Sequence, residues 1–202
     1  MIRRLLVASF LTFSLAAGTV VAAEAPATAK KTANIPLYPM VEIETSEGSF
    51  TLELNGRRAP ITVKNFLHYV QNGHYVDTVF HRVIPNFMAQ AGGYDKDHAE
   101  KPTADVIVNE SGNGLKNYRG TIAMARFNNP HSASAQFFIN LVDNDALNPN
   151  EKRWGYAVFG EVVKGMEVLD KIALIPTGSN EAFQSDYPEK TVTILKTTLV
   201  SK

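Results

Sequence analysis

The sequence of 202 residues contains no cysteine. This absence excludes a thiol nucleophile, zinc bound through cysteine and any disulfide bond. The fold must therefore be stabilised by a packed core, and 45% of the residues are hydrophobic. A chain of this length can bury enough apolar surface to fold without covalent cross-links.

The sequence also lacks net charge, since 20 lysine and arginine residues balance 20 aspartate and glutamate residues. An excess of positive charge drives binding to nucleic acid or to an acidic membrane surface, so neither partner is expected. Beyond the N-terminus, no apolar run approaches the roughly 20 residues that a membrane-spanning helix needs. We therefore expect no insertion of the mature chain into a membrane.

The N-terminus carries the one long apolar segment. Arg3 and Arg4 precede an apolar run over residues 5–17, and Val-Ala-Ala follows at 21–23. This arrangement is typical of a secretory signal peptide, so we predict that residues 1–23 are removed by cleavage. An uncleaved membrane anchor is the alternative, although the run is short for a membrane span.

The composition changes after the apolar segment. Residues 24–39 are rich in alanine, threonine, proline and lysine and have no periodicity, which predicts a flexible tether. Residues 40–202 then form one domain. Apolar residues alternate with polar ones over 41–44 and, after a glycine-bearing turn at 46–48, over 50–54. This period of two predicts a β-hairpin with one buried face.

Two later stretches have the period of an amphipathic helix. In the first, which Pro60 opens and Gly73 can end, the apolar stripe is Val63, Phe66, Leu67 and Val70. In the second, it is Met166, Leu169 and Ala173. Short β-rich runs cover residues 78–84, 87–90, 120–125, 136–142, 156–162 and 191–200. Many short strands with two helices predict a mainly β fold, a barrel or sandwich with capping helices.

The most informative stretch is Phe-His-Arg-Val-Ile-Pro-Asn-Phe-Met-Ala-Gln-Ala-Gly-Gly at residues 80–93. It places the guanidinium of Arg82 among apolar and aromatic residues, with one amide, Gln90, nearby. Arginine keeps its charge and carries five N–H donors, which can be directed at a substrate where apolar neighbours exclude water. This combination suits an uncharged substrate that needs a directed donor rather than a nucleophile or a metal. Rotation about an Xaa–Pro bond is such a reaction.

The same stretch resembles the signature of the cyclophilins, a family of peptidyl-prolyl cis-trans isomerases. Further matching blocks are Gly-Thr-Ile-Ala-Met-Ala-Arg at 120–126, Ser-Ala-Gln-Phe-Phe-Ile-Asn at 134–140 and Tyr-Ala-Val-Phe-Gly-Glu-Val-Val at 156–163. They occur in the family's order, and the resemblance extends from about Val41 to the C-terminus. The pattern is most similar to the periplasmic cyclophilins of Gram-negative bacteria.

This resemblance implies a closed, eight-stranded antiparallel β-barrel with an α-helix covering each end and the site on its outer face. It implies a periplasmic, monomeric isomerase that accelerates rotation about Xaa–Pro bonds while secreted proteins fold. Its partners are then proline-containing segments of unfolded or folding polypeptides, and no cofactor is needed. A non-catalytic binding module or chaperone that uses the same groove is the alternative. A hydrolase is disfavoured, because no nucleophile-elbow pattern or carboxylate pair is present.

The resemblance also implies roles for ten residues. Arg82 is the catalytic donor. The pocket for the proline ring is formed by Phe87, Met88, Phe138 and Leu147. The substrate backbone is hydrogen-bonded by Gln90 and Gln136 and extends along an edge formed by Ala125 and Arg126. Tyr156 stands where many family members have a histidine, and it keeps an aromatic wall.

Strand alternation gives expectations that do not depend on the family. Met88 should share a face with Gln90, and Gln136 with Phe138. Their neighbours Phe137 and Ile139 should point into the core. Large apolar side chains are core residues by default, whereas Gln136 beside an aromatic residue indicates a groove with one hydrogen-bonding group.

The five histidines show no metal-binding pattern. His68, His74 and His81 are spaced six and seven residues apart, which fits neither a helical i, i+4 pair nor a zinc motif, so no metal is expected. His68 belongs on the polar face of the first helix. Alternation directs His81 away from the side on which Arg82 lies.

The rim of the predicted site departs from the family. Ala146 occupies a position at which many cyclophilins have a tryptophan that helps to bind cyclosporin, so we predict weak cyclosporin binding. Trp154, the one tryptophan of the chain, does not match that position. The loop 127–135 also differs in composition and length, which leaves peptide selectivity near this rim open.

Overall fold

The computed structural model describes residues 36–200. The predicted signal peptide and most of the predicted tether lie outside the described residues. No helix in this part of the chain is long and apolar enough to cross a membrane.

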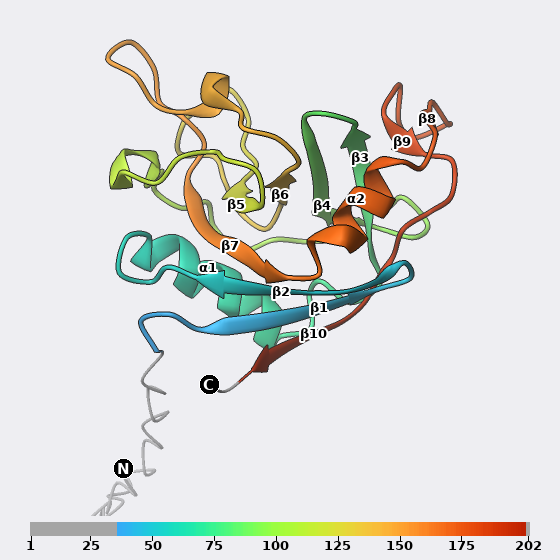
Figure 1. Cartoon of the computed structure of the whole chain (residues 1–202), viewed down its shortest axis with the longest axis horizontal. Coiled ribbons are helices and arrows are strands. Elements are labelled where there is room, and N and C mark those ends of the chain that lie inside the picture. Colours follow the sequence, from blue (N-terminus) through green and yellow to red (C-terminus); the bar gives the residue numbers. More distant parts are fainter. Residues whose placement is uncertain (1–35, 201–202) are drawn as a thin grey trace, which may run out of the picture. The chain divides into compact units, whose positions relative to one another are not determined.

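The domain is built on one antiparallel sheet of eight strands in the order β10-β1-β2-β7-β5-β6-β4-β3 (Figure 1). Its strands are β1 (Met40–Thr45), β2 (Gly48–Leu54), β3 (Thr78–Ile84), β4 (Met88–Asp95), β5 (Thr121–Met124), β6 (Phe137–Asn140), β7 (Val158–Lys164) and β10 (Ile194–Val200). The helices are α1 (Pro60–Gln71) and α2 (Met166–Ala173). Helix α1 contacts β10, and α2 contacts β2, β3 and β4. The prediction of a mainly β, antiparallel fold with two helices is confirmed.

Four smaller elements lie in connections for which the sequence predicted loops. Two are single 3-10 turns, η1 (Ser111–Asn113) and η2 (Asp145–Leu147). Two are very short strands, β8 (Thr177–Gly178) and β9 (Tyr187–Pro188), which pair with each other.

The prediction of a closed barrel is wrong, because the curled sheet is open between its edge strands β3 and β10. In place of a neighbouring strand, the N–H groups of β3 donate to carbonyls of the chain that leads into β10. Its contacts with β3 and the residue before it are Val83 N–H to Asp186 O at 2.8 Å, Phe80 N–H to Val192 O at 2.9 Å and Asp77 N–H to Ile194 O at 2.9 Å. One isolated bridge, between Val79 and Thr193, joins the two edges in place of a ladder.

The first hairpin follows the predicted alternation. The turn between β1 and β2 places Gly48 at φ 132°, a backbone conformation that side chains disfavour. All inward apolar side chains of the hairpin are at most 1% exposed: Val41, Ile43, Phe50, Leu52 and Leu54.

Helix α1 also forms where the pattern predicts it. Pro60 opens the helix, where its missing N–H has no helical partner to lose. The helix ends at Gln71, shortly before Gly73, whose φ is 69°. The predicted stripe is buried in the core: Val63, Phe66, Leu67 and Val70.

Strand β6 separates two apolar regions of different size. Phe137 and Ile139 are fully buried in the main core, as alternation predicts. Phe138 faces the other way, into a second cluster that also contains Met88, Ala123 and Val158. We call these four residues the outer cluster. It lies on the outer side of the sheet, where Met88 and Phe138 form the floor of a groove.

Candidate active site

A groove of about 200 Å³ brings together nine of the ten residues that the sequence singled out. Its lining residues are Arg82, Phe87, Met88, Gln90, Ala125, Arg126, Phe138, Leu147 and Tyr156. The tenth, Gln136, lies in an adjoining recess of about 260 Å³ that shares Gln90, Ala125 and Arg126 with the groove. The contributing segments are β3, β4, β6, η2 and the chain around β5 and before β7, so the groove exists only in the folded sheet.

The tight turn between β3 and β4 brings Arg82 and Phe87 to the same groove. Asn86 adopts φ 59°, which asparagine tolerates better than most residues. The N–H of Phe87 then donates to the carbonyl of Ile84 at 3.1 Å. The chain reverses over these few residues and places the phenylalanine at the groove as soon as β3 ends.

Arg82 is oriented by a residue that the sequence did not suggest. Its Nε donates to Asp186 Oδ2 at 3.2 Å, and 44% of its side chain is exposed. Asp186 is itself fixed, because its carbonyl accepts the N–H of Val83 from β3. Within residues 36–200 the guanidinium makes no other hydrogen bond, so both terminal nitrogens can donate to a substrate. Asp186 lies 104 positions along the chain, and no local pattern links the two.

The prediction for His81 is wrong, because β3 contains a bulge. Phe80 pairs with Ala91 and Arg82 pairs with Gln90, so two steps of β3 oppose one step of β4. The extra residue breaks the alternation and puts His81 on the same side of the sheet as Arg82. There it lines the recess that contains Gln136.

His81 is held without charge. It is 5% exposed, and its ring lies 4.8 Å from Tyr94 and 5.8 Å from Phe183, measured between ring centroids. Burial among these rings disfavours the charged imidazolium and lowers the pKa of His81 to about 4. His81 therefore adds no charge to the recess at physiological pH, and the charged side chains in its lining are Glu100 and Arg126. His68, by contrast, is exposed on the polar face of α1, as predicted.

Gln90 and Gln136 form a pair across β4 and the start of β6. Gln90 Nε2 donates to Gln136 Oε1 at 2.8 Å, and the side chain of Gln136 also interacts with His81 at the recess. Gly93 makes room for this amide, since a Cβ there would lie 2.4 Å from Gln136 Nε2. Gly93 thus serves the site through its lack of a side chain, whereas a Cβ at Gly92 would meet Tyr75 and Phe137 of the main core.

Arg126 organises the rim opposite Arg82. Its guanidinium carbon lies 4.6 Å from the ring centroid of Tyr156, within the range of a cation–π contact. Its terminal nitrogens donate to the carbonyls of Phe127 at 2.8 Å and Trp154 at 3.0 Å. The tyrosine ring meets Phe138 edge-on at 5.6 Å. One arginine therefore fixes two loops and one aromatic wall.

Trp154 does not line the groove. Its ring packs edge-on against His131 at 5.1 Å, beside a separate cavity, and 46% of the residue is exposed. Ala146 is exposed on η2 and also lies outside the groove lining. No side chain among the described residues takes the place of the family's rim tryptophan, which leaves the prediction of weak cyclosporin binding in force.

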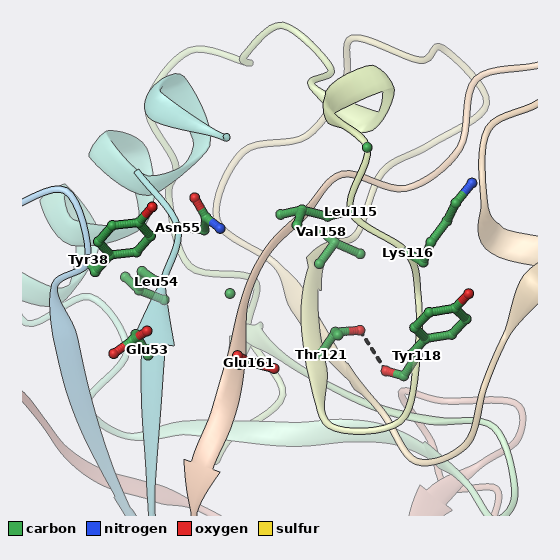
Figure 2. A pocket seen from close by; sticks show the side chains of 12 residues that line it. Tyr38, Glu53, Leu54, Asn55, Leu115, Lys116, Tyr118, Thr121, Val158 and Glu161 are labelled. Carbon is green, nitrogen blue, oxygen red and sulfur yellow. Dashed lines mark hydrogen bonds between the residues drawn. The ribbon is translucent and has the colours of Figure 1, made fainter. Parts of the chain in front are cut away.

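A larger cavity, of about 330 Å³, opens elsewhere on the outer side of β2, β7 and β5 (Figure 2). Tyr38 and Tyr118 stand at its two ends, and Glu53 and Glu161 come from facing positions on β2 and β7. None of the ten predicted residues lines it. Its volume exceeds that of the groove, but no arginine lines it. Within residues 36–200, no three His, Cys, Asp or Glu side chains are grouped as a metal site requires.

Comparison with known proteins identifies the family. The model of the cyclophilin type peptidyl-prolyl cis-trans isomerase/CLD family matches residues 40–199. The chain is 51% identical over 162 residues to a peptidyl-prolyl cis-trans isomerase of Acinetobacter baylyi, covering 80% of this chain and 86% of that one. It is 50% identical over 163 residues to peptidyl-prolyl cis-trans isomerase B of Escherichia coli, covering 79% and 99%.

Solved structures agree with this assignment. A crystal structure of a cyclophilin type isomerase from Cryptosporidium parvum superposes with a TM-score of 0.67 at 26% identity, covering 82% of this chain and 99% of that one. A second structure of that protein, in the presence of the dipeptide Ala-Pro, gives a TM-score of 0.66. The chain therefore belongs to the cyclophilin family and is a peptidyl-prolyl cis-trans isomerase.

Proposed function

We propose that the groove beside Arg82 is the site of isomerisation, with Arg82 as the donor to the prolyl nitrogen. One observation carries this proposal: a permanently charged guanidinium, with its terminal nitrogens free, borders a pocket whose floor is formed by Met88 and Phe138 of the apolar outer cluster. The cavity of Figure 2, the cavity beside Trp154 and the recess beside Gln136 do not combine these two features.

The chemistry requires only a change in bond order. Amide resonance sets a barrier of about 18–20 kcal/mol to rotation about the Xaa–Pro bond. As the bond twists, conjugation is lost and the lone pair localises on the prolyl nitrogen. A donor from Arg82 stabilises that twisted state more than the planar one, and only such differential binding raises the rate. No bond is made or broken, so no nucleophile or cofactor takes part.

The apolar side chains hold the proline ring during rotation. Met88 and Phe138 are 2% and 4% exposed and form the floor, while Phe87 and Leu147 are partly buried walls. Fixing the ring on one side of the bond lets the preceding carbonyl turn against it. The side chain of Gln136 lines the adjoining recess, where its amide can bind a backbone carbonyl of the peptide.

The proposed substrates are proline-containing segments of proteins that fold after export to the periplasm. The N-terminal segment predicted to direct secretion supports this location, and the related Cryptosporidium structure in the presence of Ala-Pro supports the substrate class. Uncatalysed isomerisation takes about 10–100 s, long enough to limit folding. The protein acts as a monomer in this proposal, because one chain supplies all groups of the groove.

Exchange NMR on a short Xaa–Pro peptide tests the proposal. Wild-type protein should exchange the cis and trans signals rapidly, and Arg82→Ala should lower kcat/KM by about 10²–10³-fold, the usual effect of losing one transition-state donor. Arg119→Ala is the matched control, since its side chain is equally 44% exposed and ion-paired, with Asp170. Peptide binding with no acceleration in the wild type would instead identify a non-catalytic binding module.

A further inference from the structure

Four buried asparagines lie behind the groove, and the sequence analysis assigned none of their side chains a role. Asn117 and Asn140 are fully buried, and Asn144 and Asn148 are 8% exposed. A buried amide is costly unless its donors and acceptors find partners. The placement of four amides at one point therefore requires a connected set of hydrogen bonds.

The four side chains form a continuous network. Asn144 Nδ2 donates to Asn140 Oδ1 at 2.7 Å, and Asn140 Nδ2 donates to Asn117 Oδ1 at 3.2 Å. The Oδ1 of Asn148 accepts the backbone N–H of Asn117 at 2.8 Å. Asn140 also donates to Thr121 Oγ1 at 2.9 Å, which fastens the network to β5. We call these four residues the asparagine network.

The network ends on the backbone of three groove walls. Asn144 Nδ2 donates to the carbonyl of Phe87 at 2.9 Å. Asn117 Nδ2 lies 3.3 Å from the carbonyls of both Leu147 and Tyr156. These three residues come from a turn, a 3-10 turn and a loop, and none lies within a strand of the sheet. Backbone hydrogen bonds also reach them, from Leu141 N–H to Phe87 O and from Tyr156 N–H to Leu147 O, both at 2.9 Å, and the asparagine side chains add the contacts that join all three walls.

We propose that the asparagine network positions the walls of the proline pocket, so that its members are positioning residues for the isomerisation. It links the Phe87, Leu147 and Tyr156 walls, which hold the ring, to the rigid strands β5 and β6, which adjoin the outer cluster. The proposal rests on the proposed function, because positioning matters only if the groove is the reaction site. A displacement of about 1 Å in such a pocket can cost two orders of magnitude in rate.

The sharpest test uses Asn144→Asp, a change that preserves shape and removes donors. An ionised carboxylate cannot donate to the carbonyl of Phe87 or to Asn140 Oδ1, so both contacts are lost. At pH 7 we expect kcat/KM to fall by about tenfold or more. At lower pH the buried carboxyl takes up a proton and regains one donor, so the activity of this variant should rise between pH 7 and pH 5. Wild type carries the same flanking carboxylates, Asp143 and Asp145, and should show no such rise.

Two controls separate positioning from stability. Ile43→Val, deep in the main core on β1, removes one methylene far from the groove and should leave kcat/KM unchanged. Assays at a temperature where urea titration shows every variant to be folded remove the contribution of unfolded protein. An Asn144→Asp activity equal to that of Ile43→Val, with a flat pH profile, would overturn the proposal.

Amide resonances of the free protein test the positioning role separately from the proposed isomerase function of the groove. In the free Asn144→Asp protein, the amide resonances of Phe87, Leu147 and Tyr156 should shift or broaden at pH 7 and recover at pH 5. If wild type proves inactive, the proposed function fails, and these resonances still decide whether the network holds the walls. Unchanged resonances at all three positions would contradict the network's positioning role directly.

Discussion

The two sides of β6 show how differently a core and a site are built. On the inner side, Phe137 meets Phe66 and Tyr75 edge-on at 5.6 and 5.3 Å in a core that strand pairing and helix packing fully define. On the outer side, Phe138 shares its groove with residues from turns and loops. The inner side owes its order to apolar burial, whereas the outer side needs hydrogen bonds to fix walls that lie outside the strands. The consequence is that stability and activity should respond to different residues.

The largest expected effect compares alanine variants at the adjacent positions 137 and 138, which lie on the two sides of β6. Phe137→Ala should lower the free energy of unfolding by about 3–5 kcal/mol, because it opens a cavity in a closed core. Phe138→Ala should cost less, about 2 kcal/mol, since the groove side can relax into solvent. Its kcat/KM should nevertheless fall by about tenfold or more through loss of apolar contact with the proline ring. Urea unfolding measures the stability of both variants, and exchange NMR measures their activity. If the two variants lose the same stability and the same activity, the difference between the inner and outer sides of β6 is contradicted.

A second effect concerns the buried imidazole beside the groove. The pKa of His81 is about 4 in the folded protein and about 6.5 when exposed, so the unfolded chain binds more protons between these values. Stability should be complete above pH 6.5 and decline as the pH falls towards 4, by about 3 kcal/mol in all. Urea titrations at pH 7 and pH 4.5 measure this loss. His81→Phe should lose less over the same range, and an identical loss would show that other groups cause it.

A third prediction sharpens the role of the donor. Arg82→Lys keeps the positive charge but loses the planar fork and the Nε contact with Asp186. We expect kcat/KM about tenfold below wild type, an intermediate value between wild type and Arg82→Ala. The unfolding free energy should hardly change, because the side chain is largely solvated. Full activity in the lysine variant would show that charge alone suffices.

The smallest expected effect lies at the rim. Trp154 packs on His131 and does not line the groove, so Trp154→Phe should alter kcat/KM by less than about twofold. Because the chain has a single tryptophan, peptide binding should also leave the intrinsic fluorescence of the wild type nearly constant. A large fluorescence change on adding an Xaa–Pro peptide would place the indole closer to the bound chain than the structure does.

Much of this molecule could be predicted from local pattern. Alternation over residues 41–54 and the i, i+3, i+4, i+7 stripe of α1 each identify a buried face. A period of two is typical of a strand, and a period of 3.6 is typical of a helix. The groove residues were found through a resemblance, and the four matching sequence blocks contain all of the ten predicted residues except Leu147. Their roles remain predictions until the variants are measured.

The failures have a common cause. A bulge in β3 is one extra residue, which the sequence does not mark, and it reverses the side on which His81 lies. Asp186 meets Arg82 across 104 positions, and the asparagine network gathers its members from β6 and two loops. The edge of β3 is taken by irregular chain before β10, which leaves the sheet open. Each of these features depends on long-range hydrogen bonds rather than on local period.

The sequence by itself determined the two helices, the eight longer strands and most of their inward faces, because these follow from hydrophobic period, and the properties of single side chains indicated the chemistry of isomerisation. Only the tertiary structure decided how Arg82 is oriented, which side His81 occupies and what holds the groove walls. These depend on partners distant in the chain, and a hydrogen bond forms only where folding brings donor and acceptor within about 3 Å.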